Sequence, residues 1–461
     1  MAADQSPQAV SVPRKLWCGL HPSIALQTPT YANQATAAAA REHPNPESTA
    51  MYRFMQSLNR KHNLQLKTFA DLHAFSLAHR TAFWAAVFDA AAFLHTGRYA
   101  AVVDESQPVD AVPRWFDGVR LNFAENMLFS ARDDDDDDDD DDGKEGGTKA
   151  DRKVAVTGVR EGGGAGAATR VTYGGLRARC GRLAAAMRAR GVGRGDRVVV
   201  VGGNSVEALV VWLASAWVGA VFSSSATDMG VKGILQRAVQ VDPKLLFMDD
   251  AALYNGTVVD LRGKMAEVVE GLRGCANFAG VVSVRRFAEA EAEARDVSRV
   301  PRAETWESFL AAGDGQPAPA FVRTGFHEPF LICYSSGTTG TPKAIVHSVG
   351  GVMINYYKEG VLHEGLGPDS VTLQYTTTGW IMYLASVGTL LFGGHAILYD
   401  GSPFQPDAGV LVRVAAQHGA TKLGISPRWL SSSGSTTPAS RRTCSWPTSR
   451  AAPTSRAASA P

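Results

Sequence analysis

Apolar and polar residues alternate with two different periods along the middle of this chain, and the two periods predict alternating helices and strands. Apolar residues three and four positions apart precede a glycine-rich stretch at 191–195, which predicts a helix that ends there. These residues are Leu176, Cys180, Leu183, Ala184 and Met187. The apolar run at 197–201 predicts a buried strand. Similar helix and strand patterns follow at 206–213, 218–223, 234–241 and 244–248. This alternation predicts an α/β fold in which β-sheets are layered with helices.

The α/β pattern extends over residues 151–430, and the chain before it has a different character. Residues 15–131 contain Trp and Phe, with apolar residues at helical spacing in 68–93 that predict core-forming helices. Residues 1–14 are predicted to be disordered. A glycine-rich patch at 162–168 lies between two strand patterns. A hairpin loop is favoured there over a dinucleotide fingerprint, because no helix begins after the glycines.

Two further segments are predicted to be disordered. Residues 132–150 include ten consecutive aspartates followed by glycine-rich sequence, and repulsion between the carboxylates keeps such a run extended. A tolerated surface insertion is favoured over a calcium site, which needs interspersed glycine and a distal glutamate. Residues 431–461 are rich in Ser, Thr and Pro and lack acidic residues. Such a tail cannot continue a packed domain and is consistent with a shifted reading frame or a mis-spliced gene.

Composition indicates a soluble globular protein. The 461 residues suffice for two or more domains, and 46 basic against 45 acidic residues give a net charge of +1. This balance does not favour nucleic acid or an anionic membrane as a partner. The five cysteines are scattered and lack metal-ligand spacing, which favours the cytosol and argues against a metal site built on cysteine. No signal peptide or membrane span is expected.

The sequence YSSGTTGTPK at 334–343 carries the strongest chemical signal. Its small residues let backbone N–H groups approach an anion, its hydroxyls can donate to phosphate oxygens, and Lys343 adds a mobile positive charge. It is not a Walker A loop, because Pro342 precedes the lysine and Ala344 follows it. An ordinary polar surface turn is the disfavoured alternative. The predicted phosphate-binding residues are Ser335, Ser336, Gly337, Thr338, Thr339, Gly340 and Lys343.

This loop resembles the signature of the adenylate-forming superfamily, which includes the acyl-CoA synthetases. VTYGGLRARC and AWVGAVFSSSATDMGVKGILQRAVQVDPKLLF resemble two further shared elements of that superfamily. RWFDGVRLNFAENML is similar to an N-terminal extension found in acetyl- and acetoacetyl-CoA synthetases. The stretches at 376–404 and 418–430 are similar to the acetoacetyl-CoA synthetases of fungal type. The resemblance extends from about residue 16 to residue 430, outside the two insertions.

The resemblance implies a two-step ligase reaction that uses ATP, Mg²⁺ and coenzyme A. Acetoacetate would first become an acyl-adenylate with release of pyrophosphate, and the CoA thiol would then displace AMP. Lys343 and Thr338 would act in catalysis, Lys343 by neutralising phosphate charge and Thr338 by donating its hydroxyl to a phosphate oxygen. Acetyl- or propionyl-CoA synthetase is the alternative within the same enzyme class.

The resemblance also implies an acid-binding wall formed by TTTGW, namely Thr376, Thr377, Thr378, Gly379 and Trp380. In the branch that uses short acids a tryptophan shortens this pocket, so Trp380 favours a small acid. The alternative for Trp380 is a core tryptophan. Asp400 in LYDGSP is interpreted as a turn-forming residue after the strand at 395–399, and not as a catalytic carboxylate.

The resemblance ends near residue 430, although the family continues beyond that point. An adenine-contacting segment, an acidic residue associated with Mg²⁺, a ribose-binding Asp and a C-terminal domain with a catalytic lysine are not recognisable after Trp429. We therefore expect a partial large domain without the C-terminal lid domain, and impaired activity. A non-catalytic fragment or nucleotide-binding remnant is the hypothesis of a different class.

Overall fold

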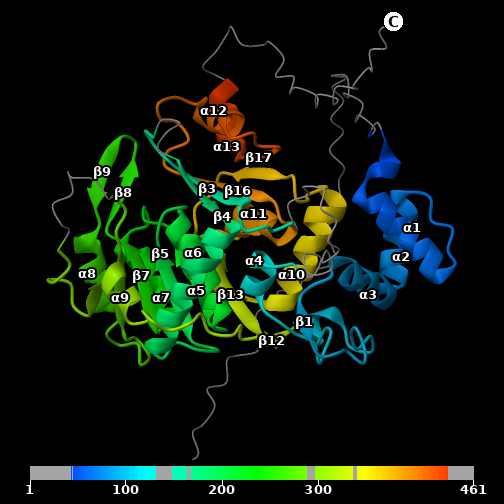
Figure 1. Ribbon diagram of the computed structural model, residues 1–461, viewed down its shortest axis with the longest axis horizontal. Coiled ribbons are helices and arrows are strands. Elements are labelled where there is room, and N and C mark those ends of the chain that lie inside the picture. Colours follow the sequence, from blue (N-terminus) through cyan, green and yellow to red (C-terminus); the bar gives the residue numbers. More distant parts are fainter. Residues whose placement is uncertain are drawn as a thin grey trace, which may run out of the picture. The chain divides into compact units, whose positions relative to one another are not determined.

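The computed structural model describes residues 43, 45–130, 148–163, 168–287, 296–335 and 340–434 (Figure 1). The chain divides into two units, which are described separately. The first unit contains the described residues up to Ala90 together with Arg98–Gly118, and the second contains Ala91–Gly97 and the described chain from Val119 onward. The aspartate run and the tail after Gly434 lie outside the described residues.

The first unit is helical, with α1 (Ala50–His62), α2 (Phe69–Ala78) and α3 (Arg80–Ala91). The helical pattern predicted at 68–93 thus forms two helices that meet at His79. Thr68 begins α2 with a capping box, because its hydroxyl accepts from the N–H of Asp71 and the Asp71 carboxylate accepts from the N–H of Thr68. The fully buried Phe116 stacks on Phe88 with ring centroids 4.8 Å apart, so aromatic packing stabilises this unit.

The second unit contains two large sheets, and the first has seven strands in the order β11-β10-β7-β5-β6-β13-β14. Its strands are β5 (Arg197–Val201), β6 (Val221–Ser225), β7 (Leu245–Asp249), β10 (Gly280–Val284), β11 (Ala303–Thr305), β13 (Pro329–Ser335) and β14 (Lys343–Ser348). All neighbouring strands are parallel except β13 and β14, which form an antiparallel hairpin. The carboxyl ends of the parallel strands therefore meet at one edge.

The second large sheet has five strands in the order β17-β15-β16-β3-β4. They are β3 (Val154–Arg160), β4 (Thr169–Thr172), β15 (Val371–Gln374), β16 (His395–Asp400) and β17 (Lys422–Gly424). Strands β3 and β4 pair antiparallel, which confirms the hairpin predicted around the glycine-rich patch. Smaller sheets are formed by β1 (His95–Thr96), β2 (Arg120–Leu121) and β12 (Thr324–Gly325), and by the hairpin β8 (Ala251–Tyr254) and β9 (Thr257–Asp260).

Helices cover the faces of both sheets (Figure 1). The helix α6 (Val206–Trp217) packs against strands of both sheets and is buried along nearly its whole length, beside α5 (Tyr173–Ala189). Helices α7 (Val231–Val241) and α8 (Arg262–Gly271) pack on the other face of the seven-stranded sheet, and α12 (Val410–Gln417) packs on the five-stranded sheet. The predicted α/β fold with layered sheets and helices is confirmed.

The remaining helices complete these layers. They are α4 (Phe123–Leu128), α9 (Trp306–Ala311), α10 (Val349–Tyr357), α11 (Met382–Val387) and α13 (Pro427–Gly434). The last of them extends four residues past the predicted boundary at 430. Lys149, from the predicted disordered insertion, is buried, and its ammonium donates to the carbonyls of Asn126 and Phe129. Within the described residues, no helix has both the length and the apolar character that a bilayer crossing requires.

Trp212 of α6 lies at the centre of an aromatic cluster. Its ring stacks with those of Phe123 and Phe222 at centroid distances of 5.3 and 5.2 Å, and with Tyr383 of α11 at 5.2 Å. The Trp212 side chain is fully buried, and dispersion between these rings accompanies the burial of a large apolar area. This aromatic cluster keeps α6, β6 and α11 at a fixed separation.

Asn122 joins three distant parts of the second unit, and its removal provides a test of the fold. Its amide donates to the carbonyls of Ala216 and Val322 at 2.7 and 2.8 Å, and its Oδ1 accepts from the N–H of Glu125. Asn122→Ala leaves these buried groups unpaired, so we expect the free energy of unfolding to fall by about 2–4 kcal/mol. Urea unfolding measures this change. Asn277→Ala, at an exposed asparagine, should change it by less than about 1 kcal/mol, and equal effects would contradict the assignment.

Candidate functional site

The predicted phosphate loop joins β13 to β14 at the carboxyl edge of the seven-stranded sheet. Ser335 is the last residue of β13 and pairs in register with Lys343, the first residue of β14. Gly340 has a φ of 79°, a left-handed conformation that favours glycine. The other predicted residues of this loop, Ser336, Gly337, Thr338 and Thr339, lie outside the described residues. Ser335 and Lys343 are therefore together at the base of the hairpin.

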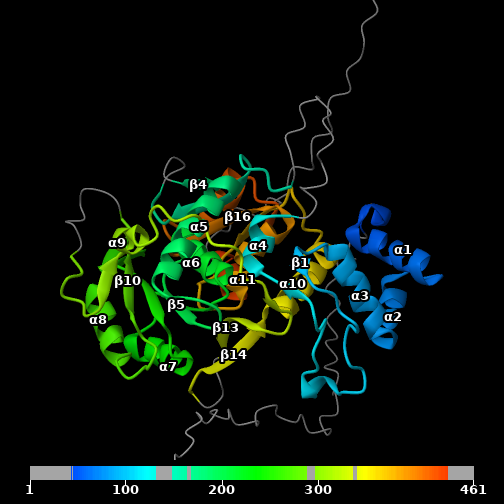
Figure 2. The ribbon, with the colours of Figure 1, turned by 60° about the horizontal axis from the view of Figure 1, so that its bottom comes forward.

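Helix α7 holds both strands of this hairpin at its base (Figure 2). The Tyr334 hydroxyl donates to the Arg237 carbonyl at 3.0 Å, and the Arg237 guanidinium lies 5.6 Å from the centroid of the Tyr334 ring. The Gln240 amide donates to the Pro342 carbonyl, next to Lys343, at 3.0 Å. Burial raises the pKa of Tyr334, so its hydroxyl stays a donor at neutral pH. These contacts fix the backbone from which Lys343 extends.

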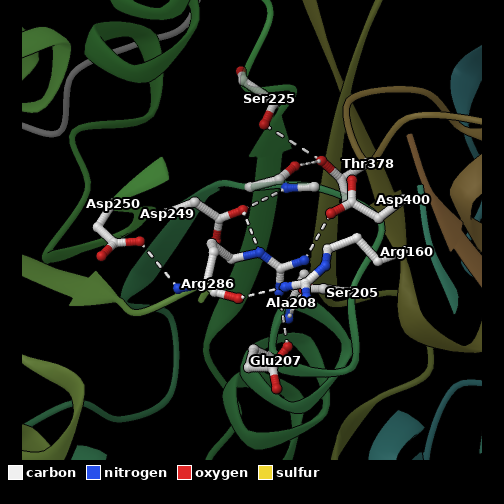
Figure 3. Close-up of polar contacts among 12 residues, drawn as sticks. Arg160, Ser205, Glu207, Ala208, Ser225, Asp249, Asp250, Arg286, Thr378 and Asp400 are labelled. Atoms are coloured by element: carbon white, nitrogen blue, oxygen red, sulfur yellow. Dashed lines mark hydrogen bonds and ion pairs between the residues drawn. The ribbon is translucent and has the colours of Figure 1, made fainter. Parts of the chain in front are cut away.

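The predicted acid-binding wall follows β15 and is anchored by Thr378. The Thr378 hydroxyl donates to the Gly202 carbonyl at 2.8 Å and lies 3.3 Å from the Ser225 carbonyl (Figure 3). The Thr378 carbonyl accepts from the Ser224 hydroxyl at 2.6 Å. Thr378 is 3% exposed. It is thus tethered to the carboxyl ends of β5 and β6, and a direct contact between its hydroxyl and a bound acid would require the loss of this bond.

The other residues of the wall are more exposed to solvent than Thr378. Thr376 and Thr377 are half-buried, and Gly379 packs with its Cα position close to the backbone of Ser225 and Ala226. Trp380 is 58% exposed, so its interpretation as a core tryptophan is wrong. Its placement beside a bound acid stays a prediction.

A buried charge cluster lies beside this wall and was not predicted from the sequence. Arg286 follows β10, and its side chain is 9% exposed. Its guanidinium pairs with Glu207 at 2.9 Å, with Asp400 at 2.7 Å and with Asp249 at 3.3 Å (Figure 3). Asp249 ends β7 and Asp400 ends β16, so the cluster joins the carboxyl ends of the two large sheets.

The interpretation of Asp400 as only a turn-forming residue is therefore incomplete, because its carboxylate belongs to this ion-pair cluster. A signal for the cluster exists in the sequence, since Asp249 and Asp400 both end apolar strand patterns. Their partner Arg286 follows a third such pattern. What the patterns do not indicate is that β16, from the other sheet, brings its carboxylate to the same guanidinium.

Burial and neighbouring charges have opposing effects on the pKa of Asp249 and on the pKa of Arg286. Burial raises the pKa of Asp249 to about 7, against the opposing effect of Arg286 and of the hydrogen bond from the N–H of Gly203. Burial also disfavours the charge on Arg286, but the three carboxylates together raise its pKa. Arg286, Asp400 and Glu207 line a cavity of about 450 Å³, whereas Asp249 is not among its lining residues. Asp249 is thus the member of the cluster most removed from water.

The described residues fit phosphate better than they fit a metal. The hairpin base combines a cationic side chain with small residues, which suits an anion. No group of three or more His, Cys, Asp or Glu in the described part of the chain could hold a metal ion. The described residues therefore include no ligand set for the expected Mg²⁺.

Comparison with protein families gives two matches. Residues 145–442 match the family of AMP-binding enzymes, and residues 69–127 match the N-terminus of acetyl-coenzyme A synthetase. The first match includes both sheets of the second unit, the hairpin of β13 and β14, and the TTTGW segment.

Individual relatives and a solved structure agree with the family matches. The acetoacetyl-CoA synthetase of Danio rerio is 38% identical over 386 residues, which is 83% of this chain and 54% of the relative. The malonamoyl-CoA synthetase of Penicillium aethiopicum is 36% identical over 78% of this chain and 48% of the relative. The acetoacetyl-CoA synthetase structure from Streptomyces lividans superposes with a TM-score of 0.71 and 32% identity, covering 84% of this chain and 55% of that one. The chain spans about half the length of these relatives.

The raised pKa of Asp249 predicts that stability falls as pH rises. Between its ordinary value of 3.8 and about 7, the unfolded chain releases a proton that the folded chain retains. Stability is therefore lost across this window and is level above it. Between pH 5 and pH 8, the free energy of unfolding should fall by about 1–3 kcal/mol less in Asp249→Asn than in the unsubstituted chain. Urea unfolding at each pH measures this difference.

Asp314→Asn is the matched control, because Asp314 forms an exposed surface pair with Arg182. This variant should retain the pH dependence of the unsubstituted protein. A pH dependence that is unchanged in Asp249→Asn would show that Asp249 ionises normally.

Proposed function

This chain belongs to the family of AMP-binding enzymes, and on that premise we propose that it serves the ATP-dependent ligation of acetoacetate to coenzyme A. The resemblance to acetoacetyl-CoA synthetases, which the segments at 376–404 and 418–430 indicated, is confirmed by the named relatives and the solved structure. Acid–thiol ligases of this family use ATP and coenzyme A. The activity itself is a proposal for this chain, because it spans about half the length of those relatives.

The proposed reaction has two steps. The acetoacetate carboxylate attacks the α-phosphorus of ATP, forms an acyl-adenylate and releases pyrophosphate. The CoA thiol then attacks the acyl carbon, and AMP leaves as acetoacetyl-CoA forms. Lys343 would neutralise phosphate charge in the first step, helped by donors of the loop at 335–340. The proposed catalytic role of Thr338 concerns a residue outside the described part of the chain.

One observation supports the proposal: the hairpin proposed to bind phosphate and the segment proposed to bind the acid both lie at the carboxyl edge of the seven-stranded sheet. Strand β6 pairs in parallel with β13, which leads into the hairpin. At the end of β6, Ser224 and Ser225 contact Thr378 of the wall. Neighbouring strands lie about 4.8 Å apart. Two segments about 40 residues apart in the sequence are thereby brought within reach of one substrate, as attack of a carboxylate on ATP requires.

The acid is proposed to be short and to carry a carbonyl at the β position. Acetoacetate and malonamate share this carbonyl and differ in the group attached to it, which is methyl in acetoacetate and amino in malonamate. The similarity to a malonamoyl-CoA synthetase therefore supports malonamate as a second candidate. Acetate and propionate, the other short acids considered, lack the β-carbonyl.

A proposal of a different class is that the 461-residue chain binds nucleotide without turnover. The partial coverage of its relatives supports this alternative. We further propose the cytosol as the compartment, since Cys180, Cys275 and Cys333 are free thiols. The proposed partners are the small-molecule substrates, and neither a membrane nor nucleic acid is proposed.

Acid-dependent exchange of labelled pyrophosphate into ATP tests adenylation in the purified chain. We expect exchange with acetoacetate to exceed exchange with acetate or propionate, and Lys343→Ala to reduce it about 100-fold or more. Lys232→Ala, at an exposed lysine of α7, is the control and should leave the rate unchanged. Preference for acetate would overturn the proposed acid. ATP binding without any exchange would favour the nucleotide-binding alternative.

The contact of Gln240 with Pro342 predicts a role in nucleotide affinity. Gln240→Met retains most of the side-chain volume but removes the donor to the Pro342 carbonyl. We expect ATP affinity, measured by isothermal titration calorimetry, to fall about 3- to 10-fold. Gln236→Met, one turn earlier on α7, is the matched control, since the Gln236 side chain makes no such bond to the described residues of the hairpin. Equal losses in both variants would contradict a specific role for Gln240.

A further inference from the structure

One peptide unit links the buried charge cluster to the acid wall. The Gly202 carbonyl accepts from the Thr378 hydroxyl at 2.8 Å, and the N–H of the same peptide, on Gly203, donates to Oδ2 of Asp249 at 2.8 Å (Figure 3). Asp249 ends a strand of the seven-stranded sheet, and Thr378 follows a strand of the five-stranded sheet. The orientation of this peptide is therefore determined by side chains from both sheets.

The surroundings leave this peptide little freedom to turn. Asp249 and Thr378 are 4% and 3% exposed, and the N–H of Gly202 donates to the Ser225 carbonyl at 3.2 Å. A Cβ at position 203 would lie 2.8 Å from Cγ of Asp400, closer than side chains tolerate. Glycine at 203 thus allows the Asp400 carboxylate to approach the turn, where it pairs with Arg286.

We propose that Asp249 is a positioning residue for the acid wall, acting through the Gly202–Gly203 peptide on Thr378 and, two residues later, on Trp380. A carboxylate that accepts from the N–H polarises the peptide and strengthens its carbonyl as an acceptor for Thr378. Removal of the charge weakens that bond and loosens the start of the wall. The role of Asp249 in acid binding rests on the proposed function, whereas the link between Asp249 and Trp380 does not.

The charge of Asp249 depends on the groups that face it. Arg286 comes from the segment after β10, Asp400 from the end of β16 and Glu207 from α6. Arg160 of β3 adds a hydrogen bond to the Arg286 carbonyl at 3.0 Å. With a pKa of about 7, Asp249 gains or loses its charge near neutral pH. The position of Trp380 should therefore change over the same pH range.

Fluorine NMR of the chain labelled with 5-fluorotryptophan tests this link without requiring turnover. Trp380→Phe identifies the Trp380 signal. We expect this signal to shift between pH 5.5 and pH 8.5 with a midpoint near 7, and the shift to disappear in Asp249→Asn. The signal of Trp115, which belongs to the first unit, is the internal control and should be unaffected by that substitution.

Two substitutions at Thr378 test the other end of the peptide without altering Asp249. Thr378→Val removes the donor to Gly202 with little change in volume, and should abolish the titration of the Trp380 signal. Thr378→Ser keeps the hydroxyl and should retain the titration of the Trp380 signal. Persistence of the titration in both Asp249→Asn and Thr378→Val would overturn the proposal. The circular dichroism spectrum of each variant shows that the comparison is made on folded protein.

Addition of acetoacetate to the same samples separates the two proposals. We expect it to shift the Trp380 signal of the unsubstituted chain, with an apparent affinity about 3- to 10-fold lower in Asp249→Asn. If the Trp380 signal titrates in an Asp249-dependent way but does not respond to acetoacetate, the proposed acid is overturned. The link between Asp249 and Trp380 is then retained. A response to acetoacetate with equal affinity in Asp249→Asn would retain the acid site and overturn the positioning role.

Discussion

The arrangement of the second unit depends on the compensation of one buried positive charge. Arg286 is removed from water and is stabilised by Asp249, Asp400 and Glu207, which come from two sheets and from the helix packed between them. Loss of one partner would leave buried charge uncompensated, which costs several kcal/mol in proteins. The ends of β7, β16 and α6 must therefore stay together. The starting points of the loops that leave the sheets at this edge are therefore held together as well.

This constraint explains how a wide site can be assembled from separate loops. The aromatic cluster around Trp212 packs α6 against β6 and α11, while the ion pairs around Arg286 hold the carboxyl ends of the two sheets together. The TTTGW segment leaves one sheet and the hairpin with Lys343 leaves the other. Reaction between an acid and a phosphate needs its groups held to within fractions of an ångström. Tethers such as that of Thr378 to Gly202 provide such rigidity.

Local patterns in the sequence were sufficient for the elements and for part of the candidate site. Helix and strand periodicity placed α5, β5, α6, α7 and β7, because each pattern reflects one element's own buried face. The loop ending in Lys343 was recognisable because its glycines, hydroxyls and lysine are contiguous. The family resemblance added the TTTGW segment to the predicted site. The alternative that Trp380 is a core residue was wrong. The presence of a large aromatic side chain in the sequence does not show whether a neighbouring element covers it.

The sequence by itself determined the α/β architecture, the family resemblance and the prediction of a phosphate loop, all of which depend on residues close together in the chain. Only the tertiary structure decided that Asp400 is an ion-pair partner of Arg286, that Gln240 fixes the carbonyl before Lys343, and that Thr378 is an anchor. These contacts join residues about 100 or more positions apart. Their strength comes from burial and from hydrogen-bond geometry, and both arise only when the two sheets pack around α6.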